Sequence, residues 1–153
     1  MTVDIDSEKI KNITKEFFDK MGFEVDVEVK VFEENTLPVD VQIEDPKILI
    51  GEGGKTLAEI QHLLKAILMK EVKSPFFFHL DINEYKKKKY QYLRELAKSI
   101  ADEVALTKKE RALSPMPAAE RRIIHLELAE RQDVVSESID QGFERRIVIK
   151  PHP

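Results

Sequence analysis

The stretch 49-LIGEGGKTLAEIQHLLKAILM-69 places a glycine-rich turn directly before an apolar helical pattern. In it, the quartet Gly51-Glu52-Gly53-Gly54 is followed by Lys55. Glycine tolerates positive φ and lets a backbone come close to a ligand, and N–H groups at a helix start favour an anion. The stretch therefore fits two interpretations: a loop that clamps a nucleic-acid backbone, or only a tight turn into a core helix.

Outward from this turn, the hydrophobic pattern of the first half predicts a mixture of helices and strands. Apolar residues at helical spacing predict helices, and alternation of apolar and polar residues predicts half-buried strands. The two strands before the turn are expected to form a hairpin, with Pro38 at an edge or a strand start because proline has no backbone N–H. The expected elements are a helix over 6–21, strands over 23–32 and 37–45, a helix over 55–72 and a strand over 76–83.

The second half continues with a long helical pattern and ends in a predicted hairpin. A turn-forming trio, Asp140-Gln141-Gly142, separates its last two strands. The expected elements are a helix over 84–107, a short strand within 110–117, a helix over 118–131 and one strand on each side of the trio. This order predicts an α+β protein of two small domains, residues 1–83 and 84–153.

The composition excludes several classes of protein. The chain has 153 residues, is 42% hydrophobic and contains no cysteine. It can therefore bury a core, but it cannot form a disulfide framework, a cysteine-ligated zinc site or a thiol nucleophile. The acidic N-terminus has no apolar signal segment, and no apolar run approaches the ~18 residues of a membrane span. We expect a cytoplasmic protein without membrane insertion.

No enzymatic centre, metal site or cofactor site is expected. The four histidines show no ligand spacing with one another. The sequence also contains no serine elbow and no pair of carboxylates in a glycine-framed site. The chain is therefore predicted to be a binding protein and not an enzyme.

Positive charge is concentrated in the second half of the chain, although the formal net charge is −4. Residues 1–83 contain 10 lysines, no arginine and 17 acidic residues, which gives −7. Residues 84–153 carry +3 and contain every arginine. Because arginine is suited to forking phosphates and stacking on bases, a polyanion is expected to bind the second half.

A run of four lysines, Lys86–Lys89, begins the long helix of the second half and is flanked by tyrosines. Cations beside aromatic rings suit a single-stranded ligand, which makes Lys86 and Lys87 candidate contacts. The alternative is an ordinary solvated helix face. In the preceding strand Phe77 is expected to pack under a helix, so no exposed set of base-reading aromatics is predicted.

Arg121 and His125 are four residues apart and so share one helix face. A solvent-facing pair of this kind can fork a phosphate with the guanidinium, while the imidazole stacks on a base or donates to a phosphate oxygen. Arg122, Arg145 and Arg146 are the candidate supporting cations. The pattern alone is weak, and the alternative is an exposed helix face with solvated charges.

The motif Leu49-Ile50-Gly51-x-x-Gly54-x-x-Leu57 resembles the I-G-x-x-G-x-x-I/L motif of KH domains. The expected elements over about residues 5–83 resemble the type II topology of that family, α-β-β-α-α-β. The resemblance implies that the glycine quartet clamps a nucleic-acid backbone and that Lys55 reaches it. KH loops usually have a basic residue at the two middle positions, which here are Glu52 and Gly53. A carboxylate opposes a nearby phosphate, so loss of RNA affinity or protein binding is the alternative.

Residues 84–153 resemble the single-stranded-nucleic-acid-binding domain that is named for its R-x-x-x-H motif. The segment Met116–Leu128 is similar to the family pattern M-x-P-x-E-R-R-x-x-H-x-x-L, with the proline one place early. Ser136 and the strand Arg145–Ile149 are similar to the terminal hairpin of the family. The second domain is therefore expected to be a small α/β unit that binds through Arg121 and His125.

The two domains in succession resemble the Jag family, also called KhpB, EloR or SpoIIIJ-associated protein, which comprises bacterial RNA-binding proteins. The small N-terminal domain that members often carry is not seen in this sequence. The resemblance implies a single-stranded RNA-binding protein, a post-transcriptional regulator or RNA chaperone-like factor. Single-stranded DNA is an alternative ligand. In a further alternative, a degenerate KH domain is a protein-interaction module that forms a homodimer or a heterodimer with a small KH protein.

Overall fold

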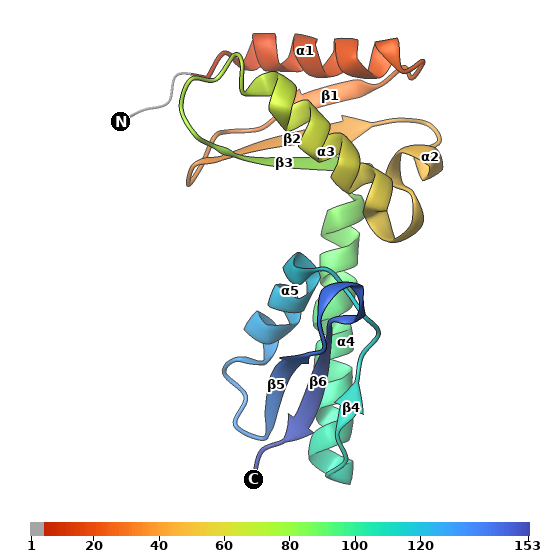
Figure 1. The fold of residues 1–153 in the computed structure, drawn as a ribbon, viewed down its shortest axis with the longest axis vertical. Helices are drawn as coiled ribbons and strands as arrows, with labels where there is room; N and C mark the ends of the chain where they lie inside the picture. The colour runs from red at the N-terminus through yellow and green to blue at the C-terminus, as the bar shows by residue number, and fades with distance from the viewer. Residues whose placement is uncertain (1–4) are drawn as a thin grey trace. The chain divides into compact units, whose positions relative to one another are not determined.

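The computed structural model describes residues 5–153, and the chain forms two compact units (Figure 1). Unit 1 extends to Lys87 and unit 2 begins at Lys88. The sequence analysis expected this boundary after residue 83. The observed boundary lies inside helix α4 (Tyr85–Thr107), because the first turn of that helix packs with unit 1.

Unit 1 is a three-stranded sheet with helices on one face (Figure 1). Its elements are α1 (Ser7–Lys20), β1 (Asp26–Val29), β2 (Thr36–Gln42), α2 (Lys47–Ile50), the 3₁₀ turn η1 (Glu52–Gly54), α3 (Lys55–Leu68) and β3 (Phe77–Ile82). The sheet order is β1-β2-β3, with β1 antiparallel and β3 parallel to the central strand. The expected hairpin is confirmed, whereas the four-residue helix α2 was not expected from periodicity.

The first helix illustrates how local sequence determines an element. The carboxylate of Asp6 accepts a hydrogen bond from the backbone N–H of Lys9 at 3.2 Å and so caps α1. Gly22 has a φ of 89° and follows the last turn, as expected of a helix stop. Between these ends, Ile10 and Phe18 are buried against the sheet. The predicted helix over 6–21 is thus confirmed to within one residue at each end.

Pro38 lies near the start of the central strand β2, so of the two expected positions, an edge or a strand start, the structure corrects the first. The antiparallel ladder between β1 and β2 ends at the pair Val29↔Val39, and Val39 is the residue directly after the proline. The carbonyl of Pro38 still accepts from the N–H of Lys30 at 2.9 Å. The proline nitrogen lies on the same β1 side, at the point where the ladder ends, so the missing donor removes only a terminal bond.

Helix α3 is less deeply packed than its apolar sequence suggested. Leu57, Ile60, Leu64 and Leu68 are buried, as their spacing predicted. Leu63 and Met69 are also apolar, yet each is 56% exposed. An amphipathic helix needs only one apolar stripe for its own core, so these side chains form additional exposed apolar surface.

The free edge of β3 is occupied by side-chain oxygens. The backbone N–H of Leu80 donates to Oε1 of Gln61 at 3.0 Å. The N–H of Ile82 donates to Oδ1 of the buried Asp81 at 2.9 Å. The same carboxylate accepts from the N–H groups of Lys86 and Lys87 at 2.9 and 3.2 Å, and so caps the first turn of α4.

Unit 2 is a small antiparallel sheet packed against two helices (Figure 1). Its elements are most of α4, β4 (Arg111–Ala112), α5 (Ala118–Leu128), β5 (Val134–Ile139), the 3₁₀ turn η2 (Gly142–Glu144) and β6 (Arg146–Pro151). The sheet order is β4-β6-β5. This element order agrees with the order predicted from the sequence, including the turn between the last two strands.

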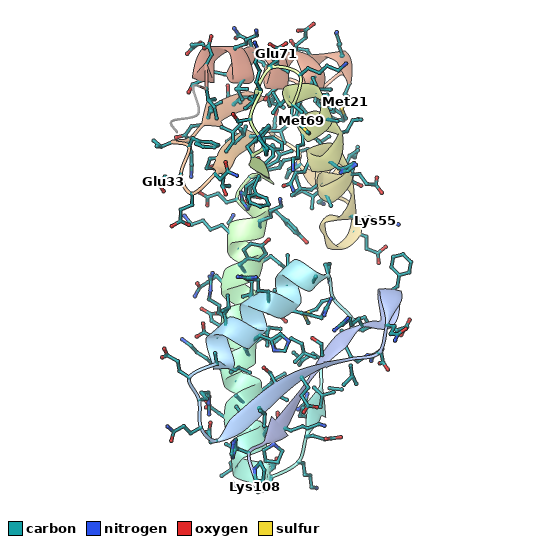
Figure 2. All side chains as sticks on the ribbon, turned by 60° about the vertical axis from the view of Figure 1, so that its left-hand side comes forward. Met21, Glu33, Lys55, Met69, Glu71 and Lys108 are labelled. Carbon is teal, nitrogen blue, oxygen red and sulfur yellow. The ribbon has the colours of Figure 1, made fainter. Side chains whose placement is uncertain are left out.

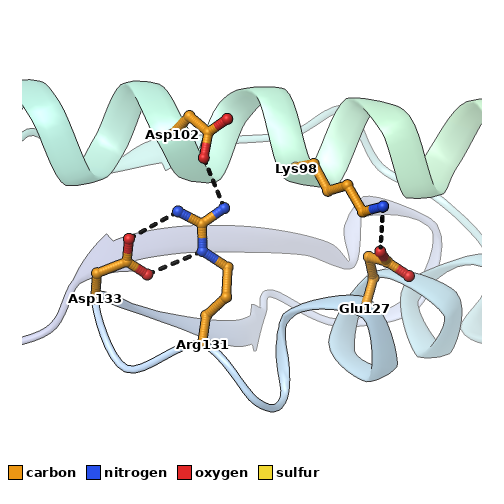
Figure 3. A network of polar contacts seen from close by, with 5 residues as sticks. All are labelled: Lys98, Asp102, Glu127, Arg131 and Asp133. Carbon is orange, nitrogen blue, oxygen red and sulfur yellow. Dashed lines mark hydrogen bonds and ion pairs between the residues drawn. The ribbon is translucent and has the colours of Figure 1, made fainter.

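Two groups of ion pairs join α4 to α5 and to the loop between α5 and β5 (Figure 3). The guanidinium of Arg131 donates to both carboxylate oxygens of Asp133, at 2.9 and 2.7 Å, and to Asp102 on α4 at 2.8 Å. Lys98 on α4 lies 3.2 Å from Glu127 on α5. The bidentate pair with Asp133 gives Arg131 a defined orientation within the loop, from which its guanidinium reaches Asp102 on α4.

No helix within residues 5–153 combines the length and the apolar character that crossing a bilayer requires.

Candidate nucleic-acid interface

The face of α5 that carries Arg121 and His125 lies against strand β5. Every second residue of β5 points to the same side of the strand. This side carries Val134, Ser136 and Ser138. Val134 joins the core of unit 2, and the two serines are half-buried. The pair on α5 therefore meets two hydroxyls, which is a correction to the solvent-facing pair expected from the sequence.

Both ring nitrogens of His125 are hydrogen-bonded to these serines. Nδ1 lies 2.7 Å from Oγ of Ser136, and Nε2 lies 3.0 Å from Oγ of Ser138. A neutral imidazole has one donor and one acceptor nitrogen, and a hydroxyl can take either role, so both bonds form in either tautomer. The imidazole thus joins α5 to β5, and neither nitrogen points to a ligand.

Arg121 is held by two hydrogen bonds on the same side of α5. Its Nε donates to the backbone carbonyl of Met116 at 3.2 Å, and its Nη1 donates to Oγ of Ser138 at 3.3 Å. A guanidinium has five N–H donors, of which these bonds use two. Arg121 therefore has a fixed orientation and still has donors that can bind an anion.

The surroundings of His125 favour its neutral form. Burial lowers the pKa of His125 below the ordinary value of 6.5, and the positive charge of Arg121 lowers that pKa further. The ring is therefore neutral at physiological pH. Positive charge at this site comes from arginine and not from the histidine.

The three supporting arginines have different surroundings. Arg122 and Arg145 are exposed, and no carboxylate among residues 5–153 lies within ion-pair distance of either. Arg146 lies 3.4 Å from a carboxylate oxygen of Asp140 and 3.0 Å from one of Glu144. Two cations are thus open to an anionic ligand, whereas the charge of Arg146 is offset within the turn between β5 and β6.

The glycine turn of unit 1 requires glycine for its own geometry. Gly51 and Gly54 have φ values of 73° and 82°. A Cβ at Gly51 would lie 2.2 Å from Oγ1 of Thr56, and a Cβ at Gly54 would lie 2.8 Å from Cε1 of Tyr85. These contacts explain both glycines without a ligand, so the tight-turn interpretation accounts for the motif, and backbone clamping remains a prediction.

The tip of the glycine turn combines an acidic and a basic side chain. Glu52 and Gly53 are exposed, and so is Lys55 at the first position of α3 (Figure 2). On the sheet, the cross-strand pair Glu28↔Asp40 places two carboxylates opposite each other, and Asp40 is paired with Lys30 at 2.8 Å. The formal charge of −7 over residues 1–83 opposes a polyanion more than it attracts one.

The two candidate lysines at the start of α4 differ in their contacts. Lys86 is half-buried and its Nζ donates to Oε1 of Gln61. Burial lowers the pKa of Lys86 to about 8, although the nearby Asp81 acts in the opposite direction. Lys87 is exposed. Of the two, only Lys87 is exposed, as the predicted contact with a single-stranded nucleic acid requires.

Sequence reasoning missed two aromatic side chains on the surface. Phe77 was expected to pack under a helix, but it is 65% exposed. Phe143, in the turn between β5 and β6, is completely exposed. Its place directly after Gly142 in a predicted turn was the one signal available. Ser138, which binds both Arg121 and His125, was also not identified, although its alternation with Ser136 could have indicated it.

Residues 5–153 contain no group of three or more histidine or acidic side chains arranged to hold a metal ion.

Comparison with known proteins identifies relatives of both units. Residues 91–151 match the family of domains named for the R-x-x-x-H motif, and the match includes α5, β5 and β6. The chain is 34% identical over 143 residues to a protein of Clostridium symbiosum named RNA-binding protein KhpB; the match covers 93% of this chain and 64% of that protein. Proteins of the same name are similar in Lactiplantibacillus plantarum (34% identity, 67% of this chain, 32% of that protein) and Bacillus subtilis (33%, 69% and 52%). The matched part of this chain therefore spans between 32% and 64% of the length of these relatives.

Proposed function

Because the chain belongs to the Jag/KhpB family, we propose that it binds single-stranded RNA through unit 2. The observation that carries this proposal is the braced guanidinium of Arg121, held by Met116 and Ser138 beside the exposed Arg122. A fixed guanidinium loses little conformational freedom when it binds a phosphate and can form charge-assisted hydrogen bonds with two oxygens. Relatives named RNA-binding proteins make RNA the first ligand to test.

In this proposal phosphate contacts supply most of the affinity. Arg121, Arg122 and Arg145 bind the sugar-phosphate backbone, and Lys87 in unit 1 offers a further exposed cation. Such contacts position a strand without reading its sequence, so low sequence specificity is expected. The role of His125 is to hold the two serines of β5 in place, since its nitrogens are already bonded. The protein would act in the cytoplasm as a non-enzymatic post-transcriptional regulator or RNA chaperone-like factor.

We further propose that unit 1 is a type II KH domain. Its support is the element order α-β-β-α-α-β, the parallel pairing of β2 with β3, and the glycine turn between α2 and α3. In such a domain the backbone of the Gly51–Gly54 turn approaches the RNA backbone, and Lys55 reaches one of its phosphates. Glu52 weakens this contact, so unit 1 contributes less affinity than unit 2.

Fluorescence anisotropy of a labelled single-stranded RNA across a salt series tests the function of unit 2. We expect Arg121→Ala to weaken binding at least tenfold, because it removes a fixed phosphate ligand. The slope of log affinity against log salt should become shallower by about 0.7, the value for one lost contact to a single strand. Arg111→Ala is the matched control, because Arg111 is in the same unit but is paired with Glu103 at 2.6 Å.

Equal binding by wild type and Arg121→Ala would remove the assigned site, and no binding by wild type would reject RNA binding altogether. A DNA strand of the same sequence distinguishes the ligands. Tighter binding of DNA than of RNA would assign single-stranded DNA as the ligand, because only RNA offers a 2′-hydroxyl.

A second candidate function, protein binding by unit 1, is favoured by the exposed apolar side chains of α3. Leu63 and Met69 are each 56% exposed, and Ile67 lies one turn after Leu63 on the same side of the helix. Exposed apolar surface of this kind is typical of an interface with a second copy of the chain or with another KH protein. In this case the acidic Glu52 costs nothing, because no phosphate approaches it.

Two variants separate these candidates. Glu52→Lys should strengthen RNA binding if the glycine turn contacts the strand, and should leave it unchanged if unit 1 binds protein. Leu63→Glu should abolish self-association, measured by sedimentation equilibrium, if α3 forms a dimer. His62→Glu is its control, since His62 is an exposed and non-apolar neighbour of Leu63. A wild-type protein that remains monomeric at all concentrations would exclude the homodimer.

A further inference from the structure

The turn between β5 and β6 presents an aromatic ring to solvent. Phe143 has a relative exposure of 101%, the highest among the large hydrophobic side chains in the described part of the chain. A ring held entirely in water gains nothing from burial within its own chain, so its whole face is available to a ligand. The exposure follows from the backbone, because Gly142 adopts a φ of 62° and begins the η2 turn at that point.

Arg146 holds this turn in shape. Its guanidinium contacts one carboxylate before Phe143 in the sequence, Asp140 at 3.4 Å, and one after it, Glu144 at 3.0 Å. Its Nε also donates to the backbone carbonyl of Glu144 at 3.2 Å. The pair Ile139↔Arg146 closes the hairpin at its base. The ring therefore extends from a turn whose backbone and carboxylates are held by Arg146.

The same turn is connected to the Arg121 site through one residue. The backbone N–H of Met116 donates to the carbonyl of Arg145 at 3.2 Å, and the carbonyl of Met116 accepts from Nε of Arg121 at 3.2 Å. Arg145 follows the ring by two residues and is itself exposed. The aromatic ring, one open cation and the braced guanidinium of Arg121 thus belong to one hydrogen-bonded end of unit 2.

We propose that Phe143 is a base-stacking residue: its ring stacks on one base of a single-stranded RNA whose neighbouring phosphates bind Arg145 and Arg121. This inference rests on the proposed RNA-binding function and adds a contact that the R-x-x-x-H motif does not contain. A base offers a flat π-face whatever its identity, so the contact adds affinity without sequence specificity. The cations track the backbone while the ring engages a base, which is the combination that single strands require.

A tryptophan at position 143 provides a direct reporter, because the chain contains no tryptophan. In Phe143→Trp, stacking on a base should quench the indole emission with the same midpoint as the anisotropy titration. Leu106→Trp is the matched control, since Leu106 is 84% exposed on the last turn of α4, away from the turn between β5 and β6. We expect no quenching of the control by the same RNA.

Affinity measurements separate stacking from a general apolar contact. Phe143→Ala should weaken binding about tenfold or more, the effect expected from the loss of one stacked base. Phe143→Tyr should keep wild-type affinity because it retains a flat ring, and Phe143→Leu should bind as weakly as the alanine variant. The salt slope should stay at the wild-type value in all three, in contrast to Arg121→Ala. Circular dichroism melting checks that these surface variants remain folded.

The outcomes distinguish this inference from the proposed function. If wild type binds no RNA, the function itself is rejected, and the inference with it. If wild type binds and Phe143→Leu binds equally well, the inference is overturned while the function stands. If Phe143→Ala binds RNA normally but reduces self-association in sedimentation, the ring is a protein contact, which also overturns the inference. Quenching of Phe143→Trp together with a weakened Phe143→Leu establishes it.

Discussion

Nδ1 of His125 on α5 and the hydroxyl oxygen of Ser136 on β5 lie 2.7 Å apart. With the bond from Nε2 to Ser138, this contact uses the whole polar edge of the imidazole inside the protein. The histidine of the R-x-x-x-H motif in this chain is therefore a link between a helix and a strand. Its importance for binding would come through the position of Arg121, which shares Ser138 as a partner.

We expect His125→Ala to destabilise the protein by about 1–3 kcal/mol, since two half-buried hydroxyls lose their partner. Urea denaturation followed by circular dichroism measures this loss. His62→Ala is the control, because His62 is exposed and its substitution should change stability by less than about 0.5 kcal/mol. Equal stabilities of the two variants would mean that the imidazole is not a structural link.

The stability of the protein should fall as the pH falls below 6.5. The folded state holds the pKa of His125 below 6.5, mainly by burial, so the unfolded chain binds more protons in that window. The contribution of His125 to folding stability is complete above pH 6.5, the ordinary pKa. It is lost as the pH falls through the lowered pKa of the folded state. His79 acts in the same direction, because burial and the charge of Lys86 lower its pKa.

An NMR titration of the histidine ring protons resolves the two residues. The midpoint of His125 should lie below 6.5 in wild type and should rise in Arg121→Ala, where the neighbouring positive charge is gone. A midpoint at or above 6.5 in wild type would contradict the neutral link.

Arg145 and Arg146 are neighbours in sequence but should respond differently to substitution. Arg145→Ala removes an open cation, so RNA affinity should fall several-fold and the salt slope should become shallower by about 0.7. Arg146→Ala removes the ion pairs with Asp140 and Glu144, so the turn between β5 and β6 becomes less ordered. RNA affinity should fall because the turn is displaced, and the salt slope should change little. A loss of slope in Arg146→Ala would instead make Arg146 a direct phosphate ligand.

Gly54→Ala should destabilise unit 1 more than Gly53→Ala. Both positions have positive φ, which costs about 1–2 kcal/mol for a residue with a Cβ. Only the Cβ at position 54 meets a neighbour, Cε1 of Tyr85 at 2.8 Å, whereas the space at position 53 is open. Urea denaturation should show the difference, and Tyr85→Ala should remove it. Equal losses in both variants would mean that the tyrosine moves aside at no cost.

The long elements of the fold could be predicted from the sequence because several turns of amphipathic helix repeat one signal. Helices α1, α3, α4 and α5 all lie within the ranges expected for them. Periodicity could not indicate α2, since its four residues span little more than one turn. The first strand was predicted too long: its pattern continues to Val31, but pairing ends at Val29 and the later valine is exposed.

The candidate site could be predicted only as far as local geometry reaches. Spacing of four correctly placed Arg121 and His125 on one face of α5, since that is a property of the helix alone. Their contact with Ser138 depends on how α5 packs on β5, and no local pattern encodes that packing. The exposure of Phe143 likewise depends on the path of the backbone through a turn. Composition predicts that a turn is present, but it does not predict where the side chains of the turn point.

The side chains that occupy the edge of β3 limit how unit 1 can associate with another chain. An edge strand normally recruits a foreign strand through its unpaired N–H groups. Here Gln61 and Asp81 already accept from the N–H groups of Leu80 and Ile82. These two donors are therefore unavailable to a foreign strand at this edge, which disfavours intermolecular sheet extension and the amyloid-like polymerisation that such extension starts. A protein partner that docks beside β3 has to recognise side chains, such as those on the exposed face of α3.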